Sequence, residues 1–144
     1  RPSVASLLHS CGAFTEKEIA VCLEIADDVL RRPDQKDYEF VVAVDPDVVG
    51  FVVYGPNACA EGVETLYWIV SGRKGVGTEL MHYMEAHIRH ARMCVLETSG
   101  KPGYDRQRNF YEKLGFHVVA RVKDFYRPGD DMVIYRKEYP VRSP

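Results

Sequence analysis

Residues 63–91 change from one hydrophobic period to another, and this change constrains the fold more than any other feature of the chain. The stretch VETLYWIV at 63–70 is rich in aromatic and β-branched side chains, which are typical of a strand. After the loop SGRKGVG, apolar residues recur at helical spacing over 76–91. The sequence therefore predicts a strand, a glycine-containing loop and a helix in direct succession. A helix that starts in this way leaves its first N–H groups free to bind an anion.

Further strands and helices are predicted on both sides of this unit. Thr15 and Glu18 form a capping-box pattern at the start of a helix over 15–32. Two β-branched runs surround a turn at 45–47 and indicate an antiparallel hairpin, in which Gly50 indicates a bulge. The other expected elements are a helix at 3–10, a strand at 93–99, a helix at 104–116 with a glycine C-cap at Gly115, and strands at 116–122 and 132–139. We expect an α/β fold of the α+β type, in which a mixed, mostly antiparallel central sheet is flanked by helices.

The composition fits one folded domain spanning residues 1–144. Apolar residues make up 46% and charged residues 28% of the chain, so intrinsic disorder is not expected. The net charge of −2 gives no general positive field for nucleic acid or anionic lipid, so any anion site has to be local. No apolar run approaches the ~18 residues of a membrane span, and no signal peptide is recognised. With four scattered cysteines and no CxxC pair, we expect a cytoplasmic protein with reduced thiols.

The loop SGRKGVG carries the groups that a phosphate binds. Gly75 and Gly77 remove side chains that would hold an anion away from the backbone, and Arg73 and Lys74 add positive charge. A nucleotide triphosphatase loop is excluded, because Gly77 is followed by a Thr-Glu pair rather than by Lys and Ser or Thr. The order of the glycines also differs from the GxGxxG of dinucleotide-binding folds. The alternative is that the glycines only form a tight turn and that both cations are solvated.

Two longer motifs resemble the GNAT superfamily of acyl-CoA-dependent N-acetyltransferases. RKGVGTELM is similar to its Gln/Arg-x-x-Gly-x-Gly/Ala loop, which opens a helix, and FYEKLGF is similar to its Tyr-x-x-x-Gly-Phe helix end. LYWIV, LETSG, NFYEKLGF and ARVKDFYRPGDDMVIYRK are similar to one branch of the superfamily, and the resemblance extends over residues 4–138. It implies the GNAT fold and transfer of an acetyl group from acetyl-CoA to an amine by direct attack within a ternary complex. The implied partner is an amine acceptor, either a small molecule or a protein, and a homodimer is a further expectation because dimers are common in the superfamily.

The resemblance also implies roles for individual residues. The pyrophosphate of coenzyme A would bind N–H groups at the helix start with help from Arg73, and pantetheine would pair with strand residues 68–70. A backbone N–H of the same strand would stabilise the oxyanion. Arg106 and Arg108 would contact the adenosine phosphates, unless they belong to a solvated helix face. The implied cofactor-binding residues are Trp68, Ile69, Val70, Arg73, Lys74, Gly75, Val76, Gly77, Thr78, Arg106 and Arg108, and no metal is expected.

The chain departs from the family pattern in three respects. The spacer between LYWIV and GVG is about four residues shorter than in that branch, and Gly72 stands where Gln or Arg is preferred. The family's usual first strand is missing before residue 4. Tyr104 occupies a position where many members carry Asn. The short spacer supports an alternative, a GNAT-fold sensor module that binds acyl-CoA without turnover; a nucleotide-binding α/β protein is a third alternative, against which the glycine order argues.

Acetyl transfer to an amine requires a general acid for the departing thiolate and a base or a water relay for the ammonium. We expect Tyr111 to be the acid, as in many GNAT enzymes. Helix geometry places Phe110 and Leu114 toward the core and Tyr111 at its edge, with a buried ring and an exposed hydroxyl. The alternative for this tyrosine is a boundary aromatic that only covers the core. Glu64 and Glu97 are the candidate bases, acting through water, and the alternative for each is a charge at a strand edge.

The segment DFYRPGDD at 124–131 is expected to form a hairpin turn. Because hairpin tips often carry function, Phe125, Tyr126 or Asp130 is a candidate for the acceptor site or for a dimer contact. The three aspartates of this segment would suit a cationic acceptor.

Overall fold

A computed structural model describes residues 2–12 and 14–140 of the chain. The helices are α1 (Pro2–Cys11), α2 (Glu16–Arg31), α3 (Val76–His87), the short 3₁₀ turn η1 (Pro102–Tyr104) and α4 (Asp105–Lys113). The strands are β1 (Glu39–Val44), β2 (Val48–Pro56), β3 (Val63–Ser71), β4 (Met93–Ser99), β5 (His117–Arg127) and β6 (Asp130–Glu138). Every element expected from the sequence is present, in the expected order.

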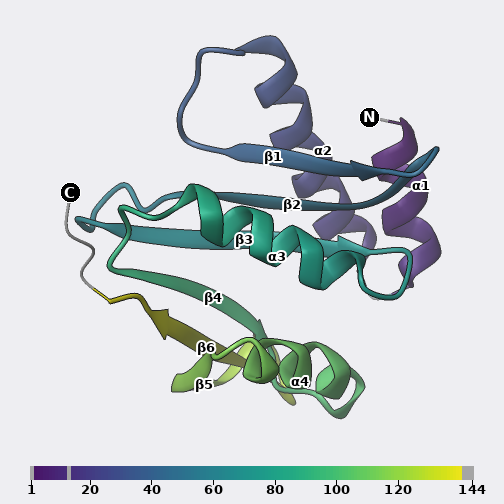
Figure 1. Cartoon of the computed structure of the whole chain (residues 1–144). Helices are drawn as coiled ribbons and strands as arrows, with labels where there is room; N and C mark the ends of the chain where they lie inside the picture. Colours follow the sequence, from purple (N-terminus) through teal and green to yellow (C-terminus); the bar gives the residue numbers. More distant parts are fainter. Residues whose placement is uncertain (1, 13, 141–144) are drawn as a thin grey trace.

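The six strands form one mixed sheet in the order β1-β2-β3-β4-β6-β5 (Figure 1). β3 and β4 are parallel neighbours, because α3 carries the chain back along one face of the sheet between them. Every other pair of neighbouring strands is antiparallel. The expected fold class is therefore confirmed.

The helices cover the two faces of the sheet over different strands. α1 and α2 pack on one face, where Leu8, Cys22 and Phe51 are fully buried against β2 and β3. α3 packs on the opposite face over the same strands, and α4 lies on that second face beside β4 and β6. Figure 1 shows α1 and α2 behind β1, β2 and β3, with α3 in front of them. The sheet is thus enclosed on both sides at β2 and β3.

Three local sequence signals are confirmed by the geometry. The Thr15 hydroxyl accepts from the Glu18 N–H, and the Glu18 carboxylate accepts from the Thr15 N–H at 2.7 Å, which completes the capping box of α2. The turn at 45–47 joins β1 to β2 as expected. Gly115 has φ of +94°, the left-handed conformation of a helix C-cap, and it ends α4.

Two element boundaries predicted from the sequence are wrong. The helix predicted to reach residue 91 ends at His87, because the chain turns at Ile88 and packs both Ile88 and Ala91 into the core. The strand predicted to end at 122 continues to Arg127. Residues 123–126 of β5 lie opposite a single residue of β6, Asp131, and the pairing of the two strands resumes at Arg127.

The bulge expected at Gly50 lies one residue earlier. The register of β1 against β2 shifts at Val49, which is the extra residue of β2. Gly50 is in register, and a Cβ atom there would lie 2.6 Å from Cγ1 of Val76. Glycine at position 50 therefore lets the first turn of α3 approach the sheet.

Candidate active site

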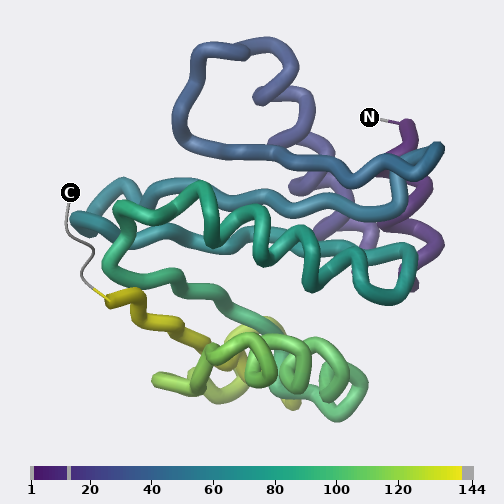
Figure 2. The backbone as a smooth tube through the Cα atoms, viewed as in Figure 1, coloured from purple at the N-terminus to yellow at the C-terminus, as the bar shows by residue number. Residues whose placement is uncertain are grey.

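The parallel strands β3 and β4 pair only at their beginnings. Residues 63–65 pair with residues 93–95, and beyond these the two strands have no paired residues. Figure 2 shows the strands diverging from this point. We call the unpaired halves, residues 66–71 of β3 and 96–99 of β4, the β3–β4 opening. Because β2 pairs with only one edge of β3, the backbone groups on the other edge at 66–71 are left for another partner.

A β-bulge in β3 lies at the start of the opening. Consecutive residues of β2 pair with Leu66 and Trp68, which leaves Tyr67 as the extra residue of β3. The extra residue changes the alternation, so that Leu66 packs under α3 while Trp68 and Val70 pack toward α1 and α2. The composition of strand 63–70 did not predict this change of face.

The start of α3 lies at the far end of the opening. Gly75 is the N-cap residue with φ of +87°, a conformation that favours glycine, and an added Cβ would meet no atom within 4 Å. In the first i→i−4 hydrogen bond of α3, the Glu79 N–H donates to the Gly75 carbonyl at 3.2 Å. The N–H groups of Gly77 and Thr78 precede this bond, have no backbone partner among the described residues and can bind an anion.

Two cations flank this helix start. Lys74 is exposed, and Arg73 donates a hydrogen bond of 2.9 Å to the Asp45 carboxylate in the β1–β2 turn. A cavity of about 210 Å³ adjoins both residues and is lined by Ala43, Val44, Asp45, Val49, Arg73, Lys74, Gly75, Val76 and Glu79. Arg73 has to exchange or share its bond to Asp45 in order to bind a phosphate.

Two glycines near the opening lie where helices pack closely. A Cβ on Gly77 would lie 3.3 Å from Cζ of Phe110, so α3 and α4 meet at this glycine. A Cβ on Gly72 would lie 2.7 Å from Cδ1 of Leu7 in α1. The close approach of α1 is a physical reason for glycine at position 72, where the resemblance leads one to expect Gln or Arg.

Tyr111 lies in the core, and the arrangement expected for this face of α4 is wrong. The residue is 8% exposed, and its ring contacts the rings of Phe110, Phe116 and Tyr135. Phe110 and Leu114, the residues expected to face the core, are only partly buried. The reason is that α4 packs against two elements at once. Phe110 contacts the start of α3, which leaves Tyr111 to face the sheet.

The surroundings of the Tyr111 hydroxyl keep it in the neutral form. Within residues 2–12 and 14–140 this hydroxyl has no hydrogen-bond partner. Burial raises the pKa of the phenol above its ordinary value, and the Cys94 thiol and the Tyr135 phenol raise it further. Tyr111 and Cys94 belong to the same core cluster, and Cys94 lies in the part of β4 that pairs with β3. Tyr111 therefore lies close to the point where β3 and β4 separate. This phenol is protonated at neutral pH and is a weaker acid than a free tyrosine, so donation of its proton depends on close positioning of the acceptor atom.

The two candidate arginines of α4 differ in the groups that they bind. The Arg108 guanidinium donates to the carbonyls of Ser99 and Lys101, both at 2.8 Å, and pairs with Asp105. These bonds hold the start of α4 against the end of β4. Arg106 is exposed and has no polar partner among the described residues, so its donors are the ones free for an adenosine phosphate.

Glu64 lies at the paired end of β3, away from the opening. It is 5% exposed, and its Oε1 lies 3.2 Å from Nε2 of His90. Burial raises the pKa of Glu64 above its usual range, and the hydrogen bond from His90 offsets part of this rise. Glu64 borders a larger cavity of about 360 Å³, lined by Lys36, Glu39, Val41, Tyr54, Pro56, Glu64, Tyr83, His87, Ile88 and His90. That cavity adjoins the last turn of α3 and is separate from the opening.

Replacing Glu64 with Gln is expected to raise the melting temperature at neutral pH. The folded protein binds the Glu64 proton more tightly than the unfolded chain, so this group favours folding below the ordinary pKa of a glutamate. This contribution to the stability of the folded protein is lost as the pH rises through the raised pKa of Glu64. Gln keeps an acceptor for His90, so the stability gain is expected to grow with pH and to stay within about 1 kcal/mol. Thermal melts of both proteins across acidic to neutral pH measure it; a gain that shrinks with rising pH would contradict the assignment.

Glu97 is the candidate base that lies along the opening. Cys94 and Leu96 of β4 pack beneath α3 and α4, so strand alternation places Glu97 and Ser99 on the opposite face. Glu97 is exposed, and within the described residues it has no hydrogen bond or ion pair. The structure thus separates the two candidate bases, Glu64 at the paired end on one face and Glu97 in the opening on the other.

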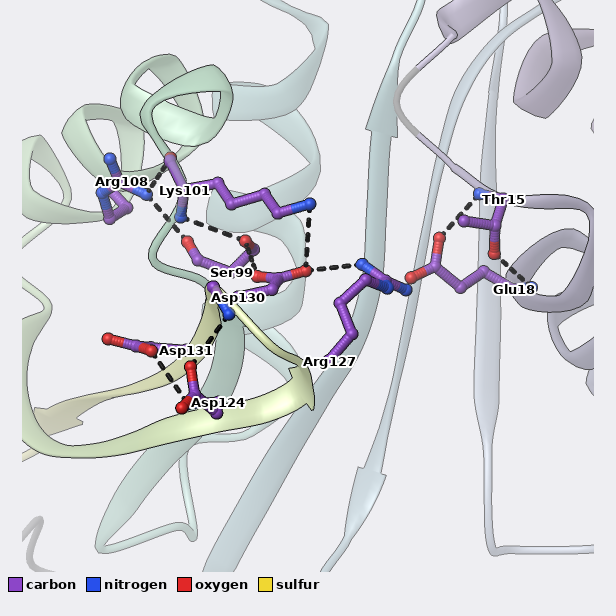
Figure 3. A network of polar contacts seen from close by, with 10 residues as sticks. Thr15, Glu18, Ser99, Lys101, Arg108, Asp124, Arg127, Asp130 and Asp131 are labelled. Carbon is purple, nitrogen blue, oxygen red and sulfur yellow. Dashed lines mark hydrogen bonds and ion pairs between the residues drawn. The ribbon is translucent and has the colours of Figure 1, made fainter.

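The aspartates of the β5–β6 hairpin are bound within the protein (Figure 3). Asp130 is 3% exposed and accepts from the Ser99 hydroxyl at 2.5 Å and from Arg127 at 2.6 Å. Lys101 lies 3.7 Å from the same carboxylate. The other two aspartates bond within the hairpin itself. The sequence-based expectation that these three carboxylates serve a cationic acceptor is therefore not supported by their contacts.

Sequence reasoning missed the residues that surround Asp130. Ser99, Lys101 and Arg127 converge on it from β4, the following loop and the end of β5. Ser99 and Asp130 are separated by 31 residues, so no local pattern could have joined them.

Neither a metal-binding cluster nor a membrane-spanning helix is found among the described residues. Within 2–12 and 14–140, no group of three or more His, Cys, Asp or Glu side chains gathers closely enough to hold a metal ion. None of the described helices has both the length and the apolar character that a membrane crossing needs. The four cysteines are free, with Cys22 and Cys94 buried.

Residues 36–118 match the family model of the acetyltransferase (GNAT) domain. The chain belongs to the GNAT family of acetyltransferases. A protein from Desulfovibrio desulfuricans assigned to the GNAT family is 37% identical, with a TM-score of 0.89 over 94% of this chain and 90% of that chain. The expected family is therefore confirmed.

Two further structures share the GNAT fold at lower identity. An aminoglycoside 6′-N-acetyltransferase complexed with coenzyme A is 19% identical, with a TM-score of 0.73 over 99% of this chain and 92% of that chain. The ribosomal-protein-S18-alanine N-acetyltransferase of Escherichia coli is 15% identical, with a TM-score of 0.74 over 99% of this chain and 89% of that chain. No curated protein matches the GNAT chain described here.

Proposed function

We propose that this GNAT protein is an N-acetyltransferase that moves the acetyl group of acetyl-CoA to an amine by direct attack within a ternary complex. One observation carries the proposal. The β3–β4 opening begins near Tyr111 and ends at the free N–H groups of the α3 start. A candidate acid and a candidate anion site thus lie at the two ends of one unpaired strand edge. Membership of the GNAT family supports acetyl transfer, and a relative is complexed with coenzyme A.

Different groups of the chain would bind different parts of acetyl-CoA. The free edge of β3 at 68–70 has the backbone donors and acceptors to pair with pantetheine. The N–H groups of Gly77 and Thr78, the positive end of the α3 dipole and Lys74 suit the pyrophosphate. The proposed binding set is Trp68, Ile69, Val70, Arg73, Lys74, Gly75, Val76, Gly77 and Thr78, with Arg106 reaching the adenosine phosphates.

The proposed chemistry assigns one task to each remaining group. Bound acetyl-CoA supplies an activated thioester. A β3 backbone N–H beyond the bulge at Tyr67 stabilises the oxyanion. Tyr111 donates its proton to the departing sulfur. Glu97 accepts the proton of the attacking amine through water, since its carboxylate has no other described partner.

A thermal shift with acetyl-CoA tests the cofactor, and an amine-dependent assay of thiol release tests the reaction. Acetyl-CoA and coenzyme A at about 100 times Kd are expected to stabilise the fold by about 2.7 kcal/mol, whereas NAD and ATP are not. No shift with acetyl-CoA would show that the short loop does not bind it. A shift without release of thiol in the presence of any amine would favour the sensor alternative.

A further inference from the structure

Glu64 has no task in the proposed reaction, although burying a carboxylate costs stability. Its side chain is 5% exposed and lies at the paired end of β3, away from the β3–β4 opening. Among the described residues its hydrogen-bond partner is His90, whose Nε2 lies 3.2 Å from Oε1. Oε2 accepts no hydrogen bond from these residues and is not fully enclosed by protein atoms, so it faces the cavity that Glu64 lines. One oxygen of a buried carboxylate is therefore available to a ligand.

Strand pairing builds the floor of this cavity. Glu39 of β1 lies opposite Tyr54 of β2, and Pro56 of β2 lies opposite Glu64 of β3. Tyr54 and Pro56 are two residues apart, so all four side chains share one face of the sheet. It is the face that α3 covers, since Tyr54 is buried in the same core cluster as Met84. Two carboxylates from different strands thus lie beside one tyrosine.

The last turn of α3 supplies an aromatic wall. The rings of Tyr83 and His87 stack with centroids 4.0 Å apart, and Nδ1 of His87 lies 2.7 Å from the Tyr83 carbonyl oxygen. Both side chains line the cavity together with Tyr54. Its volume of about 360 Å³ is large enough for a small organic molecule. Aromatic ring faces attract cations, so this wall and the carboxylates favour the same kind of ligand.

The charged groups around the cavity also favour a cation. Glu39 is exposed and makes no hydrogen bond or ion pair with the described residues. Lys36 lines the cavity as well, and its ammonium offsets one of the two carboxylates. With His87 and His90 neutral, the cavity keeps one net negative charge. A bound cation would neutralise that charge and donate to the open oxygen of Glu64.

We propose that this cavity is a second ligand site and that its ligand is a small organic cation with a guanidinium group. Oε2 of Glu64 accepts a guanidinium N–H, the rings of Tyr54 and Tyr83 contact the guanidinium plane, and Glu39 lies at the exposed rim. A guanidinium suits the site better than an ammonium, because it is planar, more weakly hydrated and stacks on aromatic rings. The inference goes beyond acetyl transfer, since no residue of this cavity belongs to the proposed binding or catalytic groups.

Three probes of similar size test the ligand class. Butylguanidinium carries the proposed group, N-butylurea has nearly the same planar shape without the charge, and butylammonium has the charge without the planar group. Isothermal titration is expected to show saturable binding of butylguanidinium. N-butylurea is expected to bind at least about 10-fold more weakly, and butylammonium about 3-fold more weakly.

Three variants locate the site. Glu64→Gln is expected to weaken the binding of butylguanidinium about 10-fold, although the same change is expected to stabilise the fold. A thermal melt therefore separates lost affinity from lost structure. Glu39→Gln, at the rim, is expected to weaken binding about 3-fold. Glu24→Gln removes an exposed carboxylate from α2, which covers the other face of the sheet, and is expected to leave affinity unchanged.

Each contrary result overturns a stated part of the inference. No saturable binding, or equal affinity for butylguanidinium and N-butylurea, would show that the cavity is not a cation site. Equal affinity for butylammonium would overturn the guanidinium class. Unchanged affinity in Glu64→Gln would place the probe elsewhere on the protein. Acetyl-CoA is expected to bind equally well with and without saturating butylguanidinium; displacement of one by the other would place the probe in the β3–β4 opening and overturn the separate site.

Discussion

Replacing Tyr111 with Phe is expected to lower kcat for acetyl transfer about 100-fold and to leave the thermal shift with acetyl-CoA unchanged. A positioned general acid contributes about 10²–10⁴ in rate, and the Phe ring keeps every ring contact of the native residue. Steady-state kinetics with saturating amine, together with the thermal shift, measure the two quantities separately.

Stability distinguishes this role from a structural one. Because the Tyr111 hydroxyl has no described hydrogen-bond partner, its removal is expected to leave stability unchanged or to increase it. Tyr135→Phe is the matched control. That hydroxyl donates to Glu112 at 3.1 Å, so its loss is expected to cost about 1 kcal/mol with kcat preserved. Full turnover in Tyr111→Phe would remove this residue from the mechanism.

Replacing Gly50 with Ala is expected to destabilise the protein by about 2–3 kcal/mol and to weaken acetyl-CoA binding as well. The added Cβ would lie 2.6 Å from Cγ1 of Val76 and 2.8 Å from the backbone oxygen of Val70. A backbone atom of the neighbouring strand cannot move aside cheaply, so the first turn of α3 has to shift. That turn carries the N–H groups proposed to bind the pyrophosphate.

Chemical denaturation measures the loss of stability, and titration with coenzyme A measures the loss of affinity. Gly103→Ala is the control, since a Cβ there would meet no atom within 4 Å. Its expected change is below about 0.5 kcal/mol. A variant at Gly50 that binds coenzyme A as tightly as the native protein would show that the α3 start tolerates displacement.

Local patterns predicted the elements well because their causes are local. The capping box of α2 and the glycine end of α4 each depend on residues within one helical turn. Where tertiary contacts decide, the same reasoning failed. Strand alternation could not show the extra residue at Tyr67, and the helical pattern to residue 91 did not show that Ile88 leaves the helix to enter the core.

The candidate site shows the same division. The glycine loop and Tyr111 could be named from motifs, because the resemblance covers contiguous residues. The two candidate bases looked equivalent in the sequence, and only the fold separates Glu64 beside His90 from Glu97 in the opening. The acidic hairpin looked available for a ligand, whereas the folded chain pairs Asp130 with Ser99 and two cations.

By itself the sequence determined the order of the elements, the mixed sheet and the glycine-containing loop that opens α3. These follow from periodicity, capping and glycine placement, which act over a few residues. Only the tertiary structure decided where β3 and β4 separate, which side of α4 carries the buried tyrosine and which carboxylates remain unpaired. Each of those depends on residues far apart in the chain, such as Gly77 with Phe110 or Ser99 with Asp130. Packing brings them together, and no local pattern records it.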